Sequence, residues 1–346
     1  MIKFGKPSID VLRYKTSFIS DNDKLLNDYQ RLFEIYIKQP KRLDCQNCSQ
    51  KIRGKTFSKM QVNYCLCSVC GHLNGLYMDT DEFCSILYAD DDGKEYATIY
   101  NVETKEDYQN RVKDIYLPKT KFLAEALLEQ GKNHSIMSVV DIGAGSGYFL
   151  TALKKTGFLN IQGYEVSKSQ IDLANKMLCK GLILQYNLNE TIEIASKVET
   201  DIISLIGVLE HLQNPREFLS ATTKNSSLKY LFLSLPLFSP TVFFEMIFDE
   251  VMPRHLAPFH THLYTESSID YFCKEFGFER VAEWWFGSDM MDLFRNVMVM
   301  LSKGESKSDA KDLWNDTFRD LMDDLQKTQD KRKKSSEVHM LLKLSE

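Results

Sequence analysis

Short apolar runs alternate with amphipathic stretches from Ile136 to about Leu301. The apolar runs predict strands, and the stretches between them carry the periodicity of helices. Strands that alternate with helices predict βαβ units and a mainly parallel sheet, which is the α/β class. The predicted strands are 137–142, 161–165, 182–185, 201–206, 230–235, 278–286 and 296–301.

The chain on either side of this region follows other patterns. Apolar positions across 25–38 form one helical stripe, which ends before Pro40 because a residue preceding proline disfavours the helix. Residues 105–130 are also predicted to be helical. After Lys303 the chain becomes polar and carries one amphipathic helix over 313–325.

Asp141 stands near the end of the first predicted strand, and the segment GAGSG at 143–147 follows it. Glycines let the backbone turn sharply and approach a ligand closely, and the next helix directs its N-terminus at that ligand. A dinucleotide fingerprint would need a glycine where Tyr148 stands, so the turn does not match that class of site. A carboxylate here repels a pyrophosphate and favours a cation, which suits the sulfonium and amino groups of S-adenosylmethionine.

Glu165 ends the second predicted strand. A carboxylate at this position can accept hydrogen bonds from both hydroxyls of a ribose. A glycine-rich turn alone is a weak signal, whereas the turn followed by an acid at this distance is considerably more specific. The alternative interpretation is a glycine turn with buried acids and no cofactor.

Four segments in order resemble the class I S-adenosylmethionine-dependent methyltransferases: VVDIGAGSGYFL, GYEVSKSQIDLANK, DIISLIGVLEHLQNP and LFLSLP. The resemblance implies a Rossmann-like sheet of seven strands, the last of them antiparallel, with S-adenosylmethionine as cofactor. It implies that Asp141 and the glycine turn line the methionine end and that Glu165 holds the ribose. Family members often have an acid after the third strand that contacts the adenine amine, and here the side-chain carbonyl of Asn187 could accept that hydrogen bond. The expected cofactor-binding residues are Asp141, Gly143, Ala144, Gly145, Gly147, Glu165, Val166, Asn187 and Gly207.

Five of the eight cysteines lie between Cys45 and Cys70. The pairs Cys45/Cys48 and Cys67/Cys70 are separated by eighteen residues, a spacing typical of zinc sites. Four thiolates complete a tetrahedron around Zn²⁺ and leave no open position, so the predicted zinc ion is structural. Cys65 is not one of the predicted zinc ligands, because Cys67 has the better spacing to Cys70. Reduced cysteines without a metal are the alternative.

The segment NYCLCSVCGHLNGLYMDTDEF, followed by Tyr88, Tyr96 and Tyr100, resembles the front domain of bacterial methyltransferases that act on nucleotide-linked deoxysugars. This resemblance implies a small-molecule acceptor, either a nucleotide-linked sugar or another glycan precursor. Two alternatives stay open: an RNA methyltransferase with a zinc finger, and a non-catalytic scaffold whose zinc module docks a partner. A net charge of −5 and the lack of a basic stripe near the cysteines disfavour nucleic acid as partner.

Methyl transfer requires alignment of the acceptor and, for a hydroxyl, an amine or an acidic carbon, removal of a proton. Glu210 and His211 follow the fourth predicted strand, where catalytic groups lie in this fold. The segment 254–264 adds three histidines and a tyrosine, although it does not cleanly reproduce the adjacent Glu-His pair of sugar C-methyltransferases. Packing roles and metal binding by His260 and His262 are the alternatives. The catalytic candidates are Glu210, His211, His255, His260, His262 and Tyr264.

A hydrophobic fraction of 43% and a charged fraction of 26% over 346 residues are ordinary for a soluble globular protein. No apolar run approaches the roughly 20 residues of a membrane helix and no signal peptide is visible, so we expect a cytoplasmic protein. A homodimer stays open. The expected segments are an N-terminal helical extension (1–40), a small zinc-ribbon domain (41–90), a helical linker and cofactor-site lid (91–134), the methyltransferase domain (135–303), and a C-terminal helix and tail (304–346).

Overall fold

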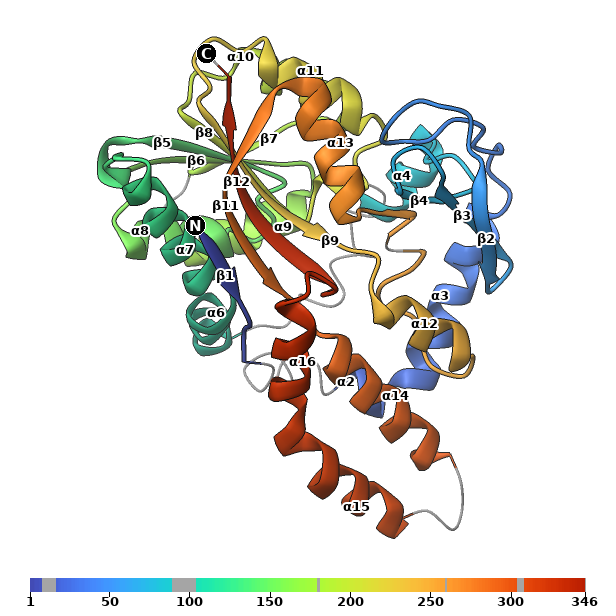
Figure 1. Ribbon diagram of the computed structural model, residues 1–346. Helices are drawn as coiled ribbons and strands as arrows, with labels where there is room; N and C mark the ends of the chain where they lie inside the picture. Colours follow the sequence, from blue (N-terminus) through green and yellow to red (C-terminus); the bar gives the residue numbers. More distant parts are fainter. Residues whose placement is uncertain (8–16, 89–103, 179–180, 259, 304–307, 346) are drawn as a thin grey trace.

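The computed structural model describes residues 1–7, 17–88, 104–178, 181–258, 260–303 and 308–345 (Figure 1). The strands are β1 (Ile2–Phe4), β2 (Gly54–Lys59), β3 (Val62–Cys67), β4 (Leu73–Gly75), β5 (Ser138–Ile142), β6 (Asn160–Glu165), β7 (Ile183–Gln185), β8 (Ile202–Ile206), β9 (Tyr230–Pro236), β10 (His262–Leu263), β11 (Phe278–Phe286) and β12 (Glu337–Leu344). The α-helices are α2 (Ser17–Ser20), α3 (Asn22–Tyr36), α4 (Asp81–Tyr88), α6 (Lys105–Arg111), α7 (Leu117–Glu129), α8 (Tyr148–Thr156), α9 (Lys168–Met177), α10 (Thr191–Lys197), α11 (Pro215–Thr223), α12 (Pro240–Ile247), α13 (Glu266–Phe276), α14 (Asp289–Ser302), α15 (Ser308–Phe318) and α16 (Met322–Asp330). Short 3₁₀ or π turns are η2 (Val112–Tyr116), η3 (His134–Ile136), η4 (Leu188–Glu190), η5 (Leu209–His211) and η6 (Arg319–Leu321).

A mostly parallel sheet of eight strands forms the centre of the molecule (Figure 1). Its order is β1-β11-β12-β9-β8-β5-β6-β7. Only β12 runs antiparallel to its neighbours in this sheet. From β5 the chain adds β6 on one side, and later β8 on the other. The loops that leave β5 and β8 therefore diverge at this point, which is where ligands bind in open α/β sheets.

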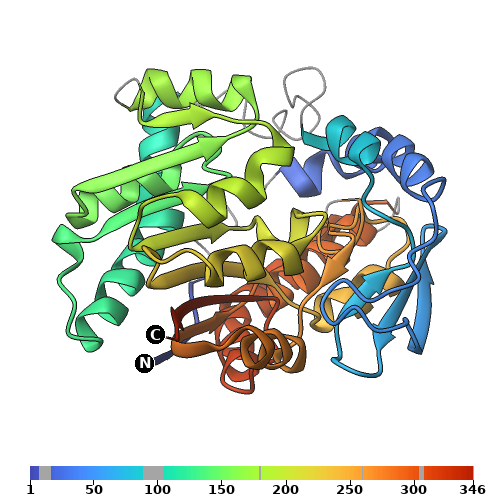
Figure 2. The same ribbon diagram turned by 90° about the horizontal axis from the view of Figure 1, so that it is seen from above.

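Helices cover both faces of this sheet, giving three layers (Figures 1 and 2). Helices α7, α8 and α9 pack apolar side chains such as Phe122 and Phe149 on one face. Helices α10, α11 and α13 pack side chains such as Phe218 and Phe272 on the other. Because both faces are covered, the inner strands are apolar along most of their length, as the continuous burial of β9 illustrates.

Six of the seven predicted strands are present, with ends within one residue of the prediction. The seventh prediction, a strand over 296–301, is wrong because these residues form the last turns of α14. Met291, Phe294 and Val299 are all buried on this helix and pack with helical spacing. A short apolar run does not distinguish a strand from a buried helical turn, which is why the pattern misled.

The antiparallel strand of the sheet comes instead from the C-terminal segment. β12 pairs with β9 on one side and with β11 on the other. The predicted domain boundary at 303/304 is therefore wrong, since α14, α15 and α16 form an excursion between two strands of one sheet. At the other end, β1 pairs parallel with β11 and makes the sheet eight-stranded, so residues 1–40 are not purely a helical extension.

A second, smaller sheet has the order β10-β4-β3-β2. Three of its strands come from the cysteine-rich region, whereas β10 comes from the chain after β9 and joins β4 in antiparallel register. Figures 1 and 2 both place the blue strands beside the gold and orange segment that follows β9. Val242, Met252 and Leu256 from that segment share a core with Phe33 and Leu73. The predicted 41–90 domain is thus built into the rest of the molecule.

No helix in the described part of the chain combines the length and the apolar character that a membrane span requires.

Candidate active site

The glycine turn after β5 has backbone that only glycine adopts readily. Gly143, Gly145 and Gly147 have φ values of 72°, 52° and 75°. A Cβ atom on Gly143 would also lie 2.6 Å from Cγ2 of Val208, so that position is closed by packing. A Cβ atom on Gly145 would meet nothing nearer than Oε1 of Gln170 at 3.9 Å. Gly145 therefore leaves open space where a ligand can approach the backbone.

Asp141 is buried in front of this turn, with 2% of its surface exposed. Ser204 donates a hydrogen bond of 2.7 Å to its Oδ1 atom. Burial raises the pKa of Asp141 to about 7, because the charged carboxylate is poorly solvated there. A bound cation would stabilise the carboxylate in its charged form.

Glu165 reaches the same turn from the end of β6. One of its oxygens accepts a hydrogen bond of 2.7 Å from the backbone N–H of Gly145. The other accepts bonds of 2.9 Å from the N–H groups of Val166 and Ser167. Burial raises the pKa of Glu165, and these three bonds act in the opposite direction. A carboxylate has about four acceptor positions, so a ribose hydroxyl would take the remaining one or replace the Gly145 N–H.

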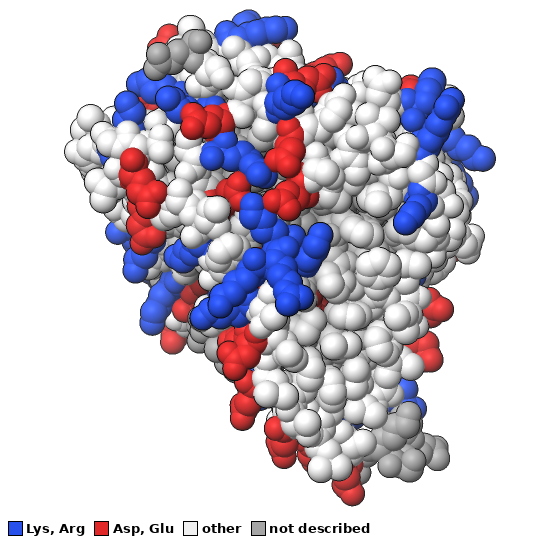
Figure 3. Space-filling view, in the orientation of Figure 1, with Lys and Arg blue, Asp and Glu red and all other residues white. Residues whose placement is uncertain are grey.

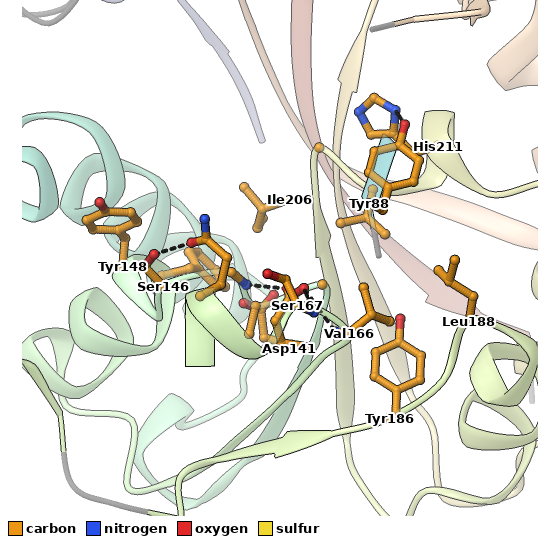
Figure 4. A pocket seen from close by; sticks show the side chains of 18 of the residues that line it. Tyr88, Asp141, Ser146, Tyr148, Val166, Ser167, Tyr186, Leu188, Ile206 and His211 are labelled. Atoms are coloured by element: carbon orange, nitrogen blue, oxygen red, sulfur yellow. Dashed lines mark hydrogen bonds between the residues drawn. The ribbon is translucent and has the colours of Figure 1, made fainter. Parts of the chain in front are cut away.

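These groups line an open cavity of about 1090 Å³, including the solvent at its mouth (Figure 4). Asp141 and the glycine turn form one part of its wall. Val166, Tyr186 and Leu188 form an apolar part, Ile206 lies apart from them, and Tyr88 and His211 stand together at another part. The lining residues are Tyr88, Tyr116, Asp141, Gly143, Ala144, Gly145, Ser146, Tyr148, Phe149, Glu165, Val166, Ser167, Gln170, Tyr186, Leu188, Ile206, Gly207, Val208, His211 and Leu212.

Of the nine residues expected to bind a cofactor, the structure places seven on the cavity wall and Gly147 at the start of α8 behind it. Asn187 differs, because it does not line the cavity. Its amide caps η4 and pairs with Glu190 at 3.1 Å. The expected contact between Asn187 and adenine is therefore not supported, and the neighbouring residues Tyr186 and Leu188 face the cavity instead.

His211 is the one catalytic candidate that lines the cavity. The hydroxyl of Tyr88 lies 2.9 Å from its Nδ1 atom. Its Nε2 atom lies 3.9 Å from Oε1 of Glu210, whose pKa burial raises to about 8. The ring of His260 stacks on that of His211 with 5.3 Å between centroids. Three of the six candidates, from two distant segments of the chain, thus form one cluster.

The other three candidates belong neither to the cavity wall nor to this cluster. His255 is buried, and its Nε2 donates to the carbonyl oxygen of Leu237 at 2.5 Å. His262 belongs to β10, and its Nδ1 lies 2.9 Å from Nε2 of His72. Tyr264 is buried against the same two histidine rings. These contacts give all three a packing role in the present geometry.

The cavity also has residues that the sequence interpretation missed. Tyr116, at the end of η2, lines the cavity and stacks on Tyr148 with 5.2 Å between centroids. No local motif marks Tyr116, because it reaches the site through the packing of one helix against another. Tyr88 was predicted only as part of an aromatic stretch, of which Tyr96 and Tyr100 lie outside the described residues.

The predicted zinc ligands meet in one buried group. The Sγ atoms of Cys45 and Cys70 are 3.6 Å apart, and those of Cys48 and Cys67 are 3.7 Å apart. All four sulfurs lie within 4.8 Å of one another. Zinc bonds of about 2.3 Å place tetrahedral sulfurs roughly 3.8 Å apart, so the four thiolates fit a structural zinc ion. Cys65 is buried but does not belong to the group.

The segment between the first two cysteines also contacts two helices of the larger domain. Asn47, between the two ligands, donates to the carbonyl oxygen of Ser268 at 3.0 Å. Its own carbonyl oxygen accepts a bond of 2.6 Å from Arg216 of α11. The cysteine group is therefore anchored to α11 and α13 of the larger domain.

Comparison with known proteins identifies the family. A family model described as "Methyltransferase domain" matches residues 108–283, just over half of the chain. No curated protein matches the chain.

Similar solved structures include the plantazolicin methyltransferase BpumL in complex with SAH. Its sequence is 15% identical to this chain, the alignment covers 76% of this chain and 94% of that one, and the TM-score is 0.46. The chain is also similar to the magnesium protoporphyrin IX methyltransferase (ChlM) from Synechocystis PCC 6803, 13% identical, covering 76% and 99% with a TM-score of 0.46. A third is a putative sarcosine dimethylglycine methyltransferase from Galdieria sulphuraria, 12% identical, covering 74% and 99% with a TM-score of 0.47. Because the family model matches more than half of the chain, the chain belongs to the methyltransferase domain family. It is an enzyme of the S-adenosylmethionine-dependent methyltransferase class.

Proposed function

We propose that the chain binds S-adenosylmethionine in the cavity beside Asp141 and Glu165 and transfers its methyl group to a small-molecule acceptor. The observation that carries the proposal is the convergence of two buried carboxylates on one glycine turn. A cation next to Asp141 would stabilise its buried negative charge. Ribose hydroxyls would donate hydrogen bonds to the carboxylate of Glu165. When bound, the cofactor supplies an electrophilic methyl group on a positively charged sulfur.

Different residues of the cavity would bind different parts of the cofactor. Asp141 and the turn around Gly145 would hold the charged methionine end. Glu165 would accept hydrogen bonds from the ribose. The apolar wall of Val166, Tyr186 and Leu188 offers a surface on which an adenine ring would pack.

The acceptor would enter on the side where Tyr88 and His211 stand. His211 is only 13% exposed, and Tyr88 holds its ring by a 2.9 Å contact. A histidine fixed in this way can orient an acceptor and receive its proton near neutral pH. Glu210, next to His211 but buried, would act on the acceptor only through that histidine.

For the acceptor we propose a nucleotide-linked sugar or a related glycan precursor. The proposal depends on the resemblance of the cysteine-rich segment to the front domain of methyltransferases with such substrates. The net charge of −5 favours a small acceptor over a nucleic acid. On the face in Figure 3, basic side chains gather in one group at the centre, with acidic ones above and below it, and in another at the upper right. The four-cysteine zinc ion would hold the fold and take no part in the chemistry.

Calorimetry with S-adenosylmethionine tests the cofactor step. We expect binding by the wild type, loss of at least tenfold in affinity for Glu165→Gln, and unchanged affinity for the exposed control Glu193→Gln. Incubation with labelled cofactor and a panel of nucleotide sugars, followed by mass spectrometry, tests the acceptor. Absence of any binding heat at millimolar cofactor would refute the proposed function. Binding without label transfer to any sugar would refute only the acceptor class.

A further inference from the structure

Two histidines and a glutamate converge next to the cavity although they come from separate segments. Glu210 and His211 belong to η5, which follows β8, and His260 precedes β10. One donor atom of each residue lies within 4.8 Å of the donor atoms of the other two. This cluster is separate from the four cysteines, and His211 brings it to the cavity wall.

The hydrogen bond of His260 decides which of its nitrogens is available. Its Nδ1 atom lies 2.9 Å from the carbonyl oxygen of His255. A carbonyl can only accept, so Nδ1 carries the hydrogen and a neutral ring has its lone pair on Nε2. Histidine ligands of metal ions commonly donate their second N–H to a carbonyl in this way, which fixes the tautomer and the ring.

His211 is oriented by the same kind of contact. The hydroxyl of Tyr88 lies on its Nδ1 side at 2.9 Å, and its Nε2 atom faces Glu210 at 3.9 Å. The stacking of the two imidazole rings, with an interplanar angle of 25°, keeps their edges side by side. Both rings are therefore held from their Nδ1 sides.

The carboxylate of Glu210 has a buried oxygen atom whose hydrogen-bonding capacity is not met within the cluster. The residue is 3% exposed, and its Oε2 atom is buried without a hydrogen-bond partner among the residues described. A buried carboxylate oxygen without a partner is unfavourable, because it has lost its hydration and gained no hydrogen bond in exchange. The other oxygen, Oε1, faces His211 at 3.9 Å. A cation between this carboxylate and the two imidazoles would neutralise it, and rotation of the carboxylate would bring Oε2 to the ion.

We propose that Glu210, His211 and His260 bind a divalent transition-metal ion at the edge of the cavity. Two imidazoles and one carboxylate suit zinc, iron or other first-row ions and leave coordination positions open. Bonds of about 2.1 Å need donor atoms roughly 3.0–3.5 Å apart, so the side chains close in by rotation when the ion binds.

Because His211 lines the cavity, the open positions would receive an oxygen of the acceptor, such as a hydroxyl or a carboxylate. This role in acceptor binding rests on the proposed function, whereas metal binding itself does not. A hydroxyl that binds the ion would have a lowered pKa and would lose its proton to water, and the resulting alkoxide would then accept the methyl group.

Metal stoichiometry tests the proposal on the full chain. Protein dialysed against 50–100 µM Zn²⁺, a range on the order of that needed for a weak site, is analysed for zinc per chain. We expect two ions in the wild type and one in His260→Ala and in Glu210→Gln. The control His134→Ala, a histidine on η3 away from the cluster, is expected to keep two. Cys48→Ala is expected to lose the other ion and keep the one in this cluster.

Two further measurements make the outcome decisive. Binding of the ion should raise the Tm of the wild type and not that of Glu210→Gln, since only the native state holds the site. Cofactor affinity, measured on the same samples, shows that the variants are folded and tests the proposed function separately. One zinc ion per wild-type chain at every concentration, with the four cysteines occupied, would overturn the proposal and leave the cluster as a proton-transfer site.

Discussion

The side-chain amide of Gln46 lies 3.1 Å from the carbonyl oxygen of Leu212, to which its Nε2 donates. The same nitrogen lies 3.2 Å from the carbonyl oxygen of Gln213. Gln46 stands between two of the four buried cysteines, and Leu212 directly follows His211. The turn that would hold the zinc ion therefore also holds the backbone that carries the catalytic candidate.

We expect Gln46→Ala to lower methyl transfer without lowering cofactor affinity. The substitution removes two hydrogen bonds, each worth about 1 kcal/mol, from the chain after His211. A fall of roughly five- to tenfold in kcat is expected, with the dissociation constant of the cofactor within about twofold of wild type. Kinetics and calorimetry on the same preparation measure both quantities.

Gln50→Ala is the matched control for this experiment, because Gln50 lies in the same module with an exposed side chain. It should leave kcat unchanged. Equal kcat values for Gln46→Ala and the wild type would show that the module does not position His211.

Removal of one zinc ligand should destabilise the whole fold. The small sheet shares its core with the segment after β9. Loss of the ion should therefore weaken packing outside residues 41–75 as well as within them. For Cys48→Ala we expect loss of the bound zinc and a Tm lower by roughly 10 °C or more. Cys65→Ala removes another buried thiol outside the group and should retain zinc with a much smaller change in Tm. Similar Tm losses in both variants would argue against a metal at these cysteines.

Cofactor binding should weaken as the pH falls below 7. The pKa of Asp141 is raised to about 7 in the ligand-free protein, chiefly by burial, and a cationic ligand requires the charged form. Below pH 7 the protein must release a proton on binding, so affinity should fall by up to about tenfold per pH unit. Calorimetry at pH 6 and pH 8 measures this slope. Asp141→Asn should bind weakly at both values, and a wild-type affinity independent of pH would contradict the assignment.

The same carboxylate should make the ligand-free protein less stable at high pH. Its pKa is about 7 in the folded chain and close to 3.8 in the unfolded chain, so the folded state binds the proton more tightly. The destabilisation is fully present above pH 7 and disappears as the pH falls toward 4. Asp141→Asn should therefore raise the free energy of unfolding at pH 8, by at most about 4 kcal/mol, and change it little at pH 4. Urea unfolding of both proteins tests the sign.

Gly143 should tolerate no side chain. Gly143→Ala adds the strain of a positive φ and a contact of 2.6 Å with Val208, and we expect a loss of about 2–4 kcal/mol in unfolding free energy. Gly131→Ala is the control, since Gly131 has a φ of 67° and open space around its Cβ position. It should lose only about 1 kcal/mol. Equal losses would mean that backbone strain alone, without the close contact, requires glycine at 143.

The amino-acid sequence by itself determined the class of the fold and most of the residues proposed to bind the cofactor. The inner strands, the glycine turn, Asp141 and Glu165 were all predictable, because each depends on residues that are close together in the chain. The four cysteines were predictable for the same reason, since each CxxC turn is local and four thiolates have one arrangement that suits zinc.

Only the tertiary structure decided which strand completes the sheet and which of the candidate side chains come together at the cavity. Residues 296–301, predicted as a strand, lie in α14, and β12 forms within the predicted C-terminal tail, because burial against partners distant in sequence selects between strand and helix for a short apolar run. His211, His260 and Tyr88 come together from three segments, and Gln46 joins them through the cysteine turn. Such contacts depend on how the cysteine-rich region and the segment after β9 fold against the larger sheet's loops, which no local pattern of residues encodes.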